Sequence, residues 1–408
     1  MLNFANITKS VGGVTLYQNA NFQVYAGEKV GVVGPNGAGK TTLFRLIIKE
    51  IAADEGEVSL QGDVHMAYFS QHVGEMKGRS AVQEVIEGHT SVSELSRKLR
   101  ALEEKLGQPN LDPDEMNKTL ERFGDIQTEY ERLGGFDVEN NAQTILSGLG
   151  IEPADHDKPV EDFSSGWKMR IALAKTLISM PDIILMDEPT NYLDMETILW
   201  LESWLKGFKG AILMTTHDRD FMNRVVGKIV EVDGGKVTSY SGNFDFYEKE
   251  KAIRLTQQEA SWNHQQSMLK KEEDFIAKFK ARASHAAQVQ SRVKKLEKIE
   301  RVDKVEEGDE IRIRLPEIPR GGNDVLTIKN LSKEWKNHDG SPKPVFSGLS
   351  ASIHRQDKIA IVGVNGAGKS TFLKVLCGLT PPTSGEIWTG PSISIGYFGQ
   401  QSLEDLKG

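Results

Sequence analysis

One segment of this chain occurs twice, and this repeat constrains the fold more than any other feature. The run GEKVGVVGPNGAGKTTL that begins at Gly27 is matched by QDKIAIVGVNGAGKSTF, which begins at Gln356. The two copies are offset by 329 positions, and this offset holds without a gap from Lys40 and Lys369 to Gln71 and Gln400. A gapless match of this length is not expected by chance, so the chain contains the start of two copies of one domain.

The two copies differ in length. The first continues far beyond Gln71, whereas the chain ends at Gly408, shortly after Gln400 of the second copy. We therefore expect a first domain over 1–240, a linker over 241–322 and the amino-terminal part of a second domain over 323–408. On this interpretation the chain is a fragment or a truncated gene product.

Each copy contains the pattern Gly-x-x-x-x-Gly-Lys-(Ser/Thr) of a P-loop. The patterns follow β-like runs at Lys29–Val33 and Lys358–Val362, and they precede helical runs at Thr42–Ile48 and Thr371–Leu376. This strand–loop–helix context predicts a cradle of backbone N–H groups for the phosphates of a nucleotide such as ATP. The predicted binding residues are Gly34, Pro35, Asn36, Gly37, Ala38, Gly39, Lys40, Thr41 and Thr42, and then Gly363, Val364, Asn365, Gly366, Ala367, Gly368, Lys369, Ser370 and Thr371. Lys40 and Lys369 are predicted to reach the phosphates, and Thr41 and Ser370 to hold Mg²⁺.

Two acids end an apolar run in the first domain. Ile183–Met186 reads as a buried parallel strand, and Asp187 and Glu188 follow it directly. Ligands bind at the carboxyl ends of such strands, so we expect Asp187 to complete the magnesium shell and Glu188 to accept a proton from the attacking water. His217 follows a second apolar strand, Ala211–Met214, and is predicted to contact the γ-phosphate.

A serine and a glycine precede a further helical run, Ile171–Ser179. Ser164 and Gly166 would place a hydroxyl and free N–H groups at the start of this helix, which is typical of an anion site. A serine that only caps the helix would give the same pattern, so the residues alone leave both interpretations open.

Composition excludes several classes of protein. The net charge of −8 argues against a protein that is basic throughout and coats nucleic acid. The single cysteine, Cys377, rules out an internal disulfide framework and is typical of a reducing cytoplasm. The chain has no run of apolar residues as long as a membrane helix, and we expect no membrane-spanning part.

Two regions have helical periodicity outside the phosphate-binding motifs. Apolar residues recur at helical spacing on both sides of the break at Gln108–Pro113, which predicts an antiparallel helical arm over about 88–135. The linker shows the same pattern, with a break near Ala283–Ala287. Its basic side chains suggest contact with a phosphate backbone, although a solvated coiled-coil face is an open alternative. These basic residues are Lys278, Lys280, Arg282, Arg292, Lys294, Lys295, Lys298 and Arg301.

Taken together, these motifs resemble those of an ABC-type ATPase, and the linker that follows Phe275 resembles that of the ABC-F branch. The corresponding segments are Walker A (Gly34–Thr42), the Q-loop (Gln71), the signature (Phe163–Trp167), Walker B (Ile183–Glu188), the D-loop (Asn191–Asp194) and the switch residue His217. The signature departs from the family's LSGGQ pattern at Phe163 and Ser165.

The resemblance implies roles for further residues. Gln71 is expected to act in catalysis and to contact the metal, and Gln400 to contribute to nucleotide binding at the second site. Ser164 and Gly166 are expected to face the nucleotide of the opposite domain. Trp335 is expected to stack on adenine in the second domain, whereas Val11 occupies that position in the first. Weaker nucleotide affinity at the first site is therefore expected.

The resemblance also implies a fold and a function. The expected fold is α/β, with P-loop ABC-type ATPase domains that carry a helical subdomain and are joined by a helical hairpin. The expected function is a cytoplasmic, ATP-driven, ribosome-associated translation factor whose linker, over 275–301, reaches the ribosome and tRNA without a membrane partner.

Two alternatives to this function remain open. One is the ATPase subunit of an ABC transporter, and the other is an ATP-dependent nucleic-acid-associated factor. Because neither composite site is complete in this chain, we expect ATP binding with poor turnover, unless two chains pair head to tail.

Overall fold

The computed structural model describes residues 2–62, 64–70, 74, 76–107, 112–279, 286–297, 299, 301, 321–336 and 340–399. The chain divides into two compact units. Unit 1 consists of residues 1–193 and 197–309, and unit 2 of residues 194–196 and 310–408. The linker helices thus belong to unit 1 in this division, which is coarser than the three predicted parts.

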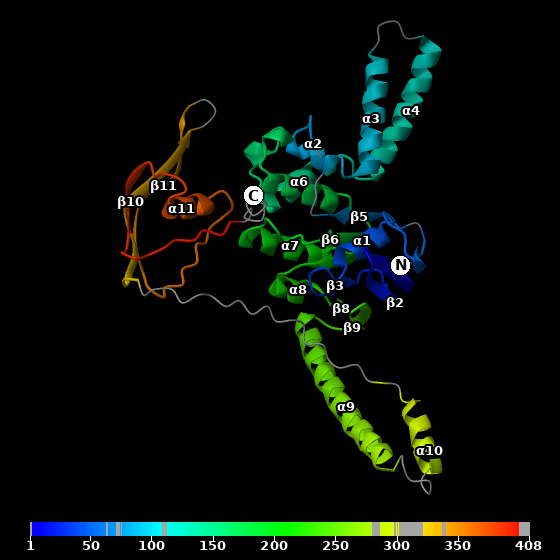
Figure 1. The fold of residues 1–408 in the computed structure, drawn as a ribbon. Helices are drawn as coiled ribbons and strands as arrows, with labels where there is room; N and C mark the ends of the chain where they lie inside the picture. The colour runs from blue at the N-terminus through cyan, green and yellow to red at the C-terminus, as the bar shows by residue number, and fades with distance from the viewer. Residues whose placement is uncertain are drawn as a thin grey trace. The chain divides into compact units, whose positions relative to one another are not determined.

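A six-stranded sheet forms the centre of unit 1 (Figure 1). Its order is β5-β6-β7-β3-β8-β9, and all neighbouring strands are parallel except the β8–β9 pair. The strands are β3 (Lys29–Val33), β5 (Met66–Phe69), β6 (Ile183–Asp187), β7 (Ala211–Thr215), β8 (Lys228–Asp233) and β9 (Lys236–Tyr240). Every residue of β6 and β7 is buried, which explains why both strands read as unbroken apolar runs.

A second, antiparallel sheet has the order β2-β1-β4 and covers one face of the central sheet. Its strands are β1 (Leu2–Val11), β2 (Val14–Val24) and β4 (Glu55–Leu60). The side chains of both sheets and of α1 (Lys40–Ile47) form one core that includes Phe4, Phe44 and Leu213. The helix that follows the P-loop is therefore fixed by burial of its apolar face.

Helices pack against unit 1 and extend from it. Unit 1 has a second cluster of buried apolar side chains. The helices that contribute to it are α2 (Ala81–Ile86), α5 (Val138–Gly148), α6 (Ser165–Ile178), α7 (Met195–Gly207) and α8 (Arg219–Val225). The predicted arm consists of α3 (Thr90–Leu106) and α4 (Pro113–Arg132), which lie side by side (Figure 1). The Lys105 ammonium lies 2.7 Å from a Glu115 carboxylate oxygen and joins the two helices.

The linker contains the long helix α9 (Phe244–Phe279) and the shorter α10 (Ala286–Glu297), which pack against each other. The Arg292 guanidinium lies 2.5 Å from a Glu272 carboxylate oxygen and 3.9 Å from the centre of the Phe275 ring. The predicted break near Ala283–Ala287 falls largely outside the described residues, as do Lys280, Arg282 and Lys298.

Unit 2 has an antiparallel sheet of order β11-β10-β12 and the helix α11 (Lys369–Leu376). Its strands are β10 (Asp324–Lys336), β11 (Pro342–His354) and β12 (Ser384–Thr389). The predicted strand at Lys358–Val362 is wrong, because this segment pairs with no other described strand. Its counterpart in unit 1, β3, lies between β7 and β8, and the described part of unit 2 contains no counterpart of either.

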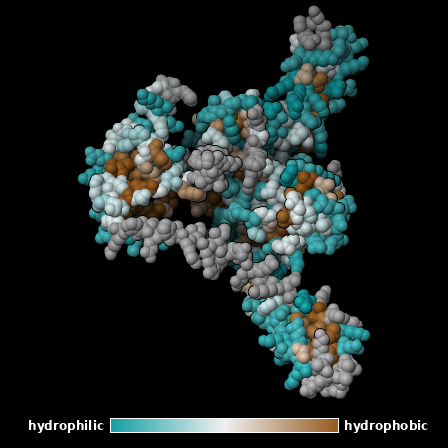
Figure 2. Space-filling view, viewed as in Figure 1, coloured by the Kyte–Doolittle hydropathy of each residue, from teal (hydrophilic) through white to brown (hydrophobic). Residues whose placement is uncertain are grey.

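The missing sheet leaves apolar side chains of unit 2 exposed. Val362 is 87% exposed and Phe398 is 89% exposed. Figure 2 shows apolar side chains gathered on the face of this unit. Among its described residues the buried apolar side chains are few: Leu326, Ile328, Leu331, Val375 and Leu376. No helix in the described ranges is both long enough and apolar enough to cross a bilayer.

Candidate functional site

The P-loop of unit 1 joins β3 to α1 and depends on two glycines with positive φ. Gly34 has φ 155°, and a Cβ atom there would lie 2.2 Å from the carbonyl oxygen of Val232. Gly39 has φ 101° and directly precedes α1, and a Cβ atom there would lie 2.7 Å from the Tyr17 hydroxyl. Side chains are excluded at both positions, so the loop keeps its backbone open towards the cavity.

Lys40 and Thr41 lie at the start of α1. The Lys40 ammonium donates to the carbonyl oxygens of Gly34 and Pro35 at 2.9 and 3.1 Å, so its side chain lies back across the loop. The Thr41 hydroxyl donates to Asp187 Oδ2 at 2.7 Å. The helix N-terminus adds partial positive charge at the same place, and the arrangement suits an anion.

Asp187 and Glu188 lie where β6 ends, at the edge of the sheet that also carries the P-loop. Asp187 is 4% exposed, and its Oδ1 accepts the Thr215 hydroxyl at 2.6 Å. The Glu188 N–H donates to both oxygens of Thr215 at 3.1 Å. Glu188 has φ 54°, a left-handed conformation that is costly for a non-glycine residue and that is found most often at functional sites.

His217 faces Glu188 from the end of β7. Glu188 Oε2 accepts the His217 backbone N–H at 3.1 Å, and Oε1 lies 3.4 Å from His217 Nε2. Burial raises the pKa of Glu188 above its ordinary value, and the neighbouring His217 only partly opposes this effect. A carboxylate with a raised pKa is better suited to accept a proton from water.

These residues line one cavity of about 600 Å³. It contains the P-loop residues Asn36, Gly37, Gly39, Lys40, Thr41 and Thr42 together with Asp187, Glu188, His217, Val11, Val14 and Leu16. The structure thus brings the predicted motifs of unit 1 together, whereas Gln71 and Gln400 lie outside the described residues.

Sequence reasoning did not identify two contributors to this site. One is Thr215, whose hydroxyl orients Asp187 and which lies only two residues before the predicted His217. The other is Tyr17, whose hydroxyl donates to the Gly39 carbonyl oxygen. The repeat carried a signal for Tyr17, because an aromatic residue, Phe346, occupies the matching position in the second copy.

The oxygen atoms of Thr41 and Asp187 lie together and could act as metal ligands. They fit Mg²⁺, which prefers carboxylate and hydroxyl oxygens and keeps waters and phosphates as further ligands. Within the described ranges, no group of three or more His, Cys, Asp or Glu side chains is arranged to hold a metal ion by itself. A magnesium ion here would therefore need oxygens from the nucleotide.

The P-loop of unit 2 has a similar local conformation in different surroundings. Gly363 has φ 154° and Gly368 has φ 90°. The Lys369 ammonium donates to the carbonyl oxygens of Gly363 and Val364 at 2.7 and 2.8 Å. Trp335, the predicted adenine-stacking residue, lies on β10 and is 45% exposed.

The signature segment begins α6. Ser164 is the N-cap residue of this helix in extended conformation, but its side chain does not accept the capping hydrogen bond. Gly166 lies in the first turn, where a Cβ atom would come within 3.9 Å of Tyr192 in the D-loop. The Arg170 side chain is 1% exposed and donates to the Tyr192 carbonyl oxygen, which links the signature helix to the D-loop.

Comparison with known proteins gives the family. A family model described as ABC transporter matches residues 17–191 and 346–405, and a second model with the same description matches 230–315. "Probable ATP-binding protein YheS" of Escherichia coli (strain K12) is 34% identical over 410 residues, which are 100% of this chain and 61% of that protein. "ABC transporter F family member 2" of Arabidopsis thaliana is 34% identical over 403 residues, which are 98% of this chain and 59% of that protein.

A solved structure, "Structure of ATP binding subunit of ABC transporter", aligns with 62% of this chain and 94% of its own, with 19% identity and a TM-score of 0.45. The chain spans about three-fifths of the length of these curated relatives. The first family model alone covers more than half of the chain. The chain therefore belongs to the ABC transporter family of ATPases, in the ABC-F branch.

Proposed function

We propose that this chain works as an ATP-hydrolysing, ribosome-associated translation factor of the cytoplasm, in which ATP drives closure of two domains. The observation that supports ATP chemistry is the cavity in which the P-loop, Asp187, Glu188 and His217 meet. The observation that supports a ribosomal partner is the basic helical hairpin of the linker, which a family model matches as part of residues 230–315.

In the proposed reaction the P-loop N–H groups and Lys40 bind the phosphates of ATP. Thr41, Asp187 and Gln71 hold Mg²⁺, which would neutralise phosphate charge when bound. Glu188 orients the attacking water and accepts its proton, and His217 contacts the γ-phosphate. The 3.4 Å distance between Glu188 Oε1 and His217 Nε2 supports the proposal that both groups act on the same phosphate.

The second site would use the P-loop of unit 2, with Ser370 at the metal, Gln400 at the nucleotide and Trp335 against adenine. Ser164 and Gly166 would contact the nucleotide held by the opposite domain. Pairing of two chains head to tail would bring Ser164 and Gly166 of one chain to the P-loop of the other, and analytical ultracentrifugation with and without ATP would detect it.

The proposed RNA contact lies on α10 and the end of α9. Lys294 and Lys295 are exposed in the last turn of α10, where a helix favours cations, and Lys278 lies in the last turn of α9. Cations presented on a narrow hairpin can approach a phosphate backbone with little desolvation. The −8 net charge of the chain makes such contact a local property of the hairpin.

Co-sedimentation with ribosomes tests this proposal. Glu188→Gln removes the proposed base and should trap the ATP-bound state, so it should pellet with ribosomes in ATP but not in ADP. Glu152→Gln, an exposed carboxylate outside the cavity, is the matched control and should behave as the wild type. Absence of ATP-dependent pelleting would contradict the ribosomal assignment. Salt-sensitive binding to naked RNA or DNA, without ribosome binding, would favour a nucleic-acid-associated factor instead.

A further inference from the structure

A second cavity lies at the opposite edge of the central sheet from the nucleotide cavity. It has a volume of about 1160 Å³. Its lining includes Asp182 and Gly210, which directly precede β6 and β7, and Gly27, which lies shortly before β3. The P-loop and Asp187 lie at the other ends of these strands. None of the residues that line this cavity lines the nucleotide cavity, so the two are separate features of unit 1.

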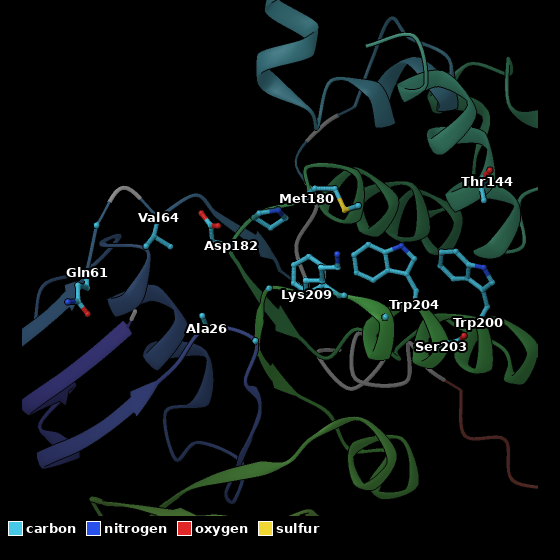
Figure 3. Close-up of a pocket in the computed structure, with 16 residues that line it drawn as sticks. Ala26, Gln61, Val64, Thr144, Met180, Asp182, Trp200, Ser203, Trp204 and Lys209 are labelled. Carbon is cyan, nitrogen blue, oxygen red and sulfur yellow. The ribbon is translucent and has the colours of Figure 1, made fainter. Parts of the chain in front are cut away.

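The wall of this cavity is largely apolar and includes aromatic side chains (Figure 3). Trp200 and Trp204 come from α7, and Phe208 follows them. The Trp204 and Phe208 rings stack with centroids 5.3 Å apart and an interplanar angle of 14°. Trp200 is held against α5, because a Cβ atom at Gly148 would lie 2.0 Å from its indole ring. Both indoles are thus fixed before any ligand arrives, which lowers the entropic cost of binding.

Two further features indicate a ligand site. Met180 is 67% exposed at the cavity and has φ 42°, a strained conformation for a residue with a side chain. It lies in the short connection between α6 and β6. Two costly features, exposure of a large apolar side chain and left-handed backbone, therefore coincide at the mouth of the same cavity.

The cavity also contains one cation. Lys209 lies beside Trp204 and across from Asp182 (Figure 3). Within the described ranges, the structure gives the Lys209 ammonium no hydrogen-bond or ion-pair partner. The Asp182 carboxylate already accepts the backbone N–H of His65 at 2.9 Å. The Lys209 side chain is exposed at the cavity, so its ammonium can pair with an anionic group there.

We propose that this cavity binds a small planar aromatic molecule that carries a negative charge. Its ring would pack against Trp200, Trp204 and Met180, and its anionic group would pair with Lys209. The size and the largely apolar lining with few polar groups are typical of small-molecule sites. The proposal does not depend on the function assigned to the nucleotide cavity. An occupant would contact the connection between α6 and β6, two elements that carry nucleotide-site motifs, which suits a regulatory ligand.

Fluorine NMR of the full chain labelled with fluorotryptophan can locate binding, because the chain has six tryptophans and each resonance can be assigned by substitution. The probes are anilinonaphthalene sulfonate, which is aromatic and anionic, and N-phenylnaphthylamine, its uncharged analogue. Both should shift the Trp200 and Trp204 resonances saturably, and the sulfonate should bind more tightly. Saturating MgATP should not displace either probe.

Lys209→Met tests the charge. It should weaken binding of the sulfonate up to about fivefold and leave the uncharged probe unaffected, because an exposed ion pair contributes on that scale. Lys206→Met is the matched control, since Lys206 lies close by in the last turn of α7, outside the cavity, and pairs with Glu202 at 2.6 Å. Trp200→Leu should weaken the binding of both probes.

Two results would overturn the proposal. One is a shift only at Trp335 or Trp388, which would assign the binding to the exposed apolar face of unit 2. The other is equal affinity of wild type and Lys209→Met for the sulfonate, which would show that the site has no preference for an anion. Lys209 is exposed, so its substitution should leave the fold intact and keep the second result informative.

Discussion

The two P-loops of this chain are alike within the loop and unlike in what surrounds them. Gly34 and Gly363 have φ 155° and 154°, and in both loops the lysine ammonium donates to two loop carbonyl oxygens. A Cβ atom at Gly34 would lie 2.2 Å from Val232 on β8, whereas at Gly363 it would meet only the Ala367 side chain, at 3.6 Å. The loop conformation is therefore local, and the neighbouring sheet does not create it.

The segments before the two loops show the opposite behaviour. Val30 is fully buried in β3, but its counterpart Ile359 is 59% exposed and belongs to no described strand. A parallel strand has no hydrogen bonds of its own and forms only when neighbours complete its ladder. The comparison teaches that a P-loop needs only its local sequence, whereas the strand that supports it needs distant partners.

The first prediction tests whether unit 1 depends on buried contacts that extend into the linker. Glu231 on β8 is 1% exposed, and its oxygens accept hydrogen bonds from Tyr240, Tyr247 and Arg254 and lie 2.5 Å from the Lys251 ammonium. Glu231→Ala should destabilise unit 1 by about 3 kcal/mol, because it leaves these donors without their acceptor. Chemical denaturation would measure the loss, with the exposed Glu152→Ala as control.

The same residue predicts a dependence on pH. Burial opposes ionisation of Glu231, but hydrogen bonds from Lys251 and Tyr247 outweigh burial and hold its pKa below the ordinary 4.5. A lowered pKa stabilises the fold at a pH above the ordinary value, and this contribution is lost as the pH falls through the lower folded value. The stability gap between wild type and Glu231→Gln should therefore shrink in acid. A gap that widens in acid would contradict this assignment.

The second prediction compares the two loops directly. Lys40→Ala should lower the ATP affinity of the chain about 50-fold, because it removes a charged phosphate contact from a supported site. Lys369→Ala should have a smaller effect on the total binding, since its loop lacks a supporting strand. Titration with a fluorescent ATP analogue would measure both. A larger effect of Lys369→Ala would show that adenine stacking on Trp335 contributes more to ATP affinity than a supporting strand does.

The third prediction concerns the matched positions in the preceding segments. Val30→Ala should cost unit 1 about 2 kcal/mol, because it removes fully buried methyl groups and leaves a cavity. Ile359→Ala removes more atoms but should cost less than about 0.5 kcal/mol, since the side chain is largely in solvent. Hydrogen exchange can follow the two units separately. Equal losses of stability at Val30 and Ile359 would contradict the conclusion that only the first segment is supported by neighbouring strands.

The fourth prediction has the smallest expected effect. It concerns an exposed contact, in contrast to the buried contacts of the earlier predictions. The ion pair between Lys105 and Glu115 joins the arm helices, and both side chains are about half exposed. Lys105→Ala should lower stability by only about 0.5 kcal/mol, as is usual for exposed pairs. Thermal denaturation in low and high salt would measure it, and any effect should fall with added salt.

Much of the molecule could be predicted from the sequence because its signals are local. The glycines of the P-loops, the apolar runs of β6 and β7 and the helical spacing of the arm each depend on nearby residues. The apolar runs that precede Asp187, Glu188 and His217 also indicated that these residues lie at strand ends, where a ligand of the P-loop would bind. Their roles in catalysis remain predictions.

Other features were decided only by tertiary structure, because they depend on residues far apart in the chain. Thr215 orients Asp187 across two strands, and Tyr17 reaches the P-loop from β2. The segment Lys358–Val362 has the sequence of a strand, but no described neighbour pairs with it. The aromatic cavity joins the ends of strands with α5 and α7, which no periodicity indicates. The sequence by itself determined the loops that can bind phosphate, and the assembled sheet decided which of them is supported, because β-strands are stabilised by pairing.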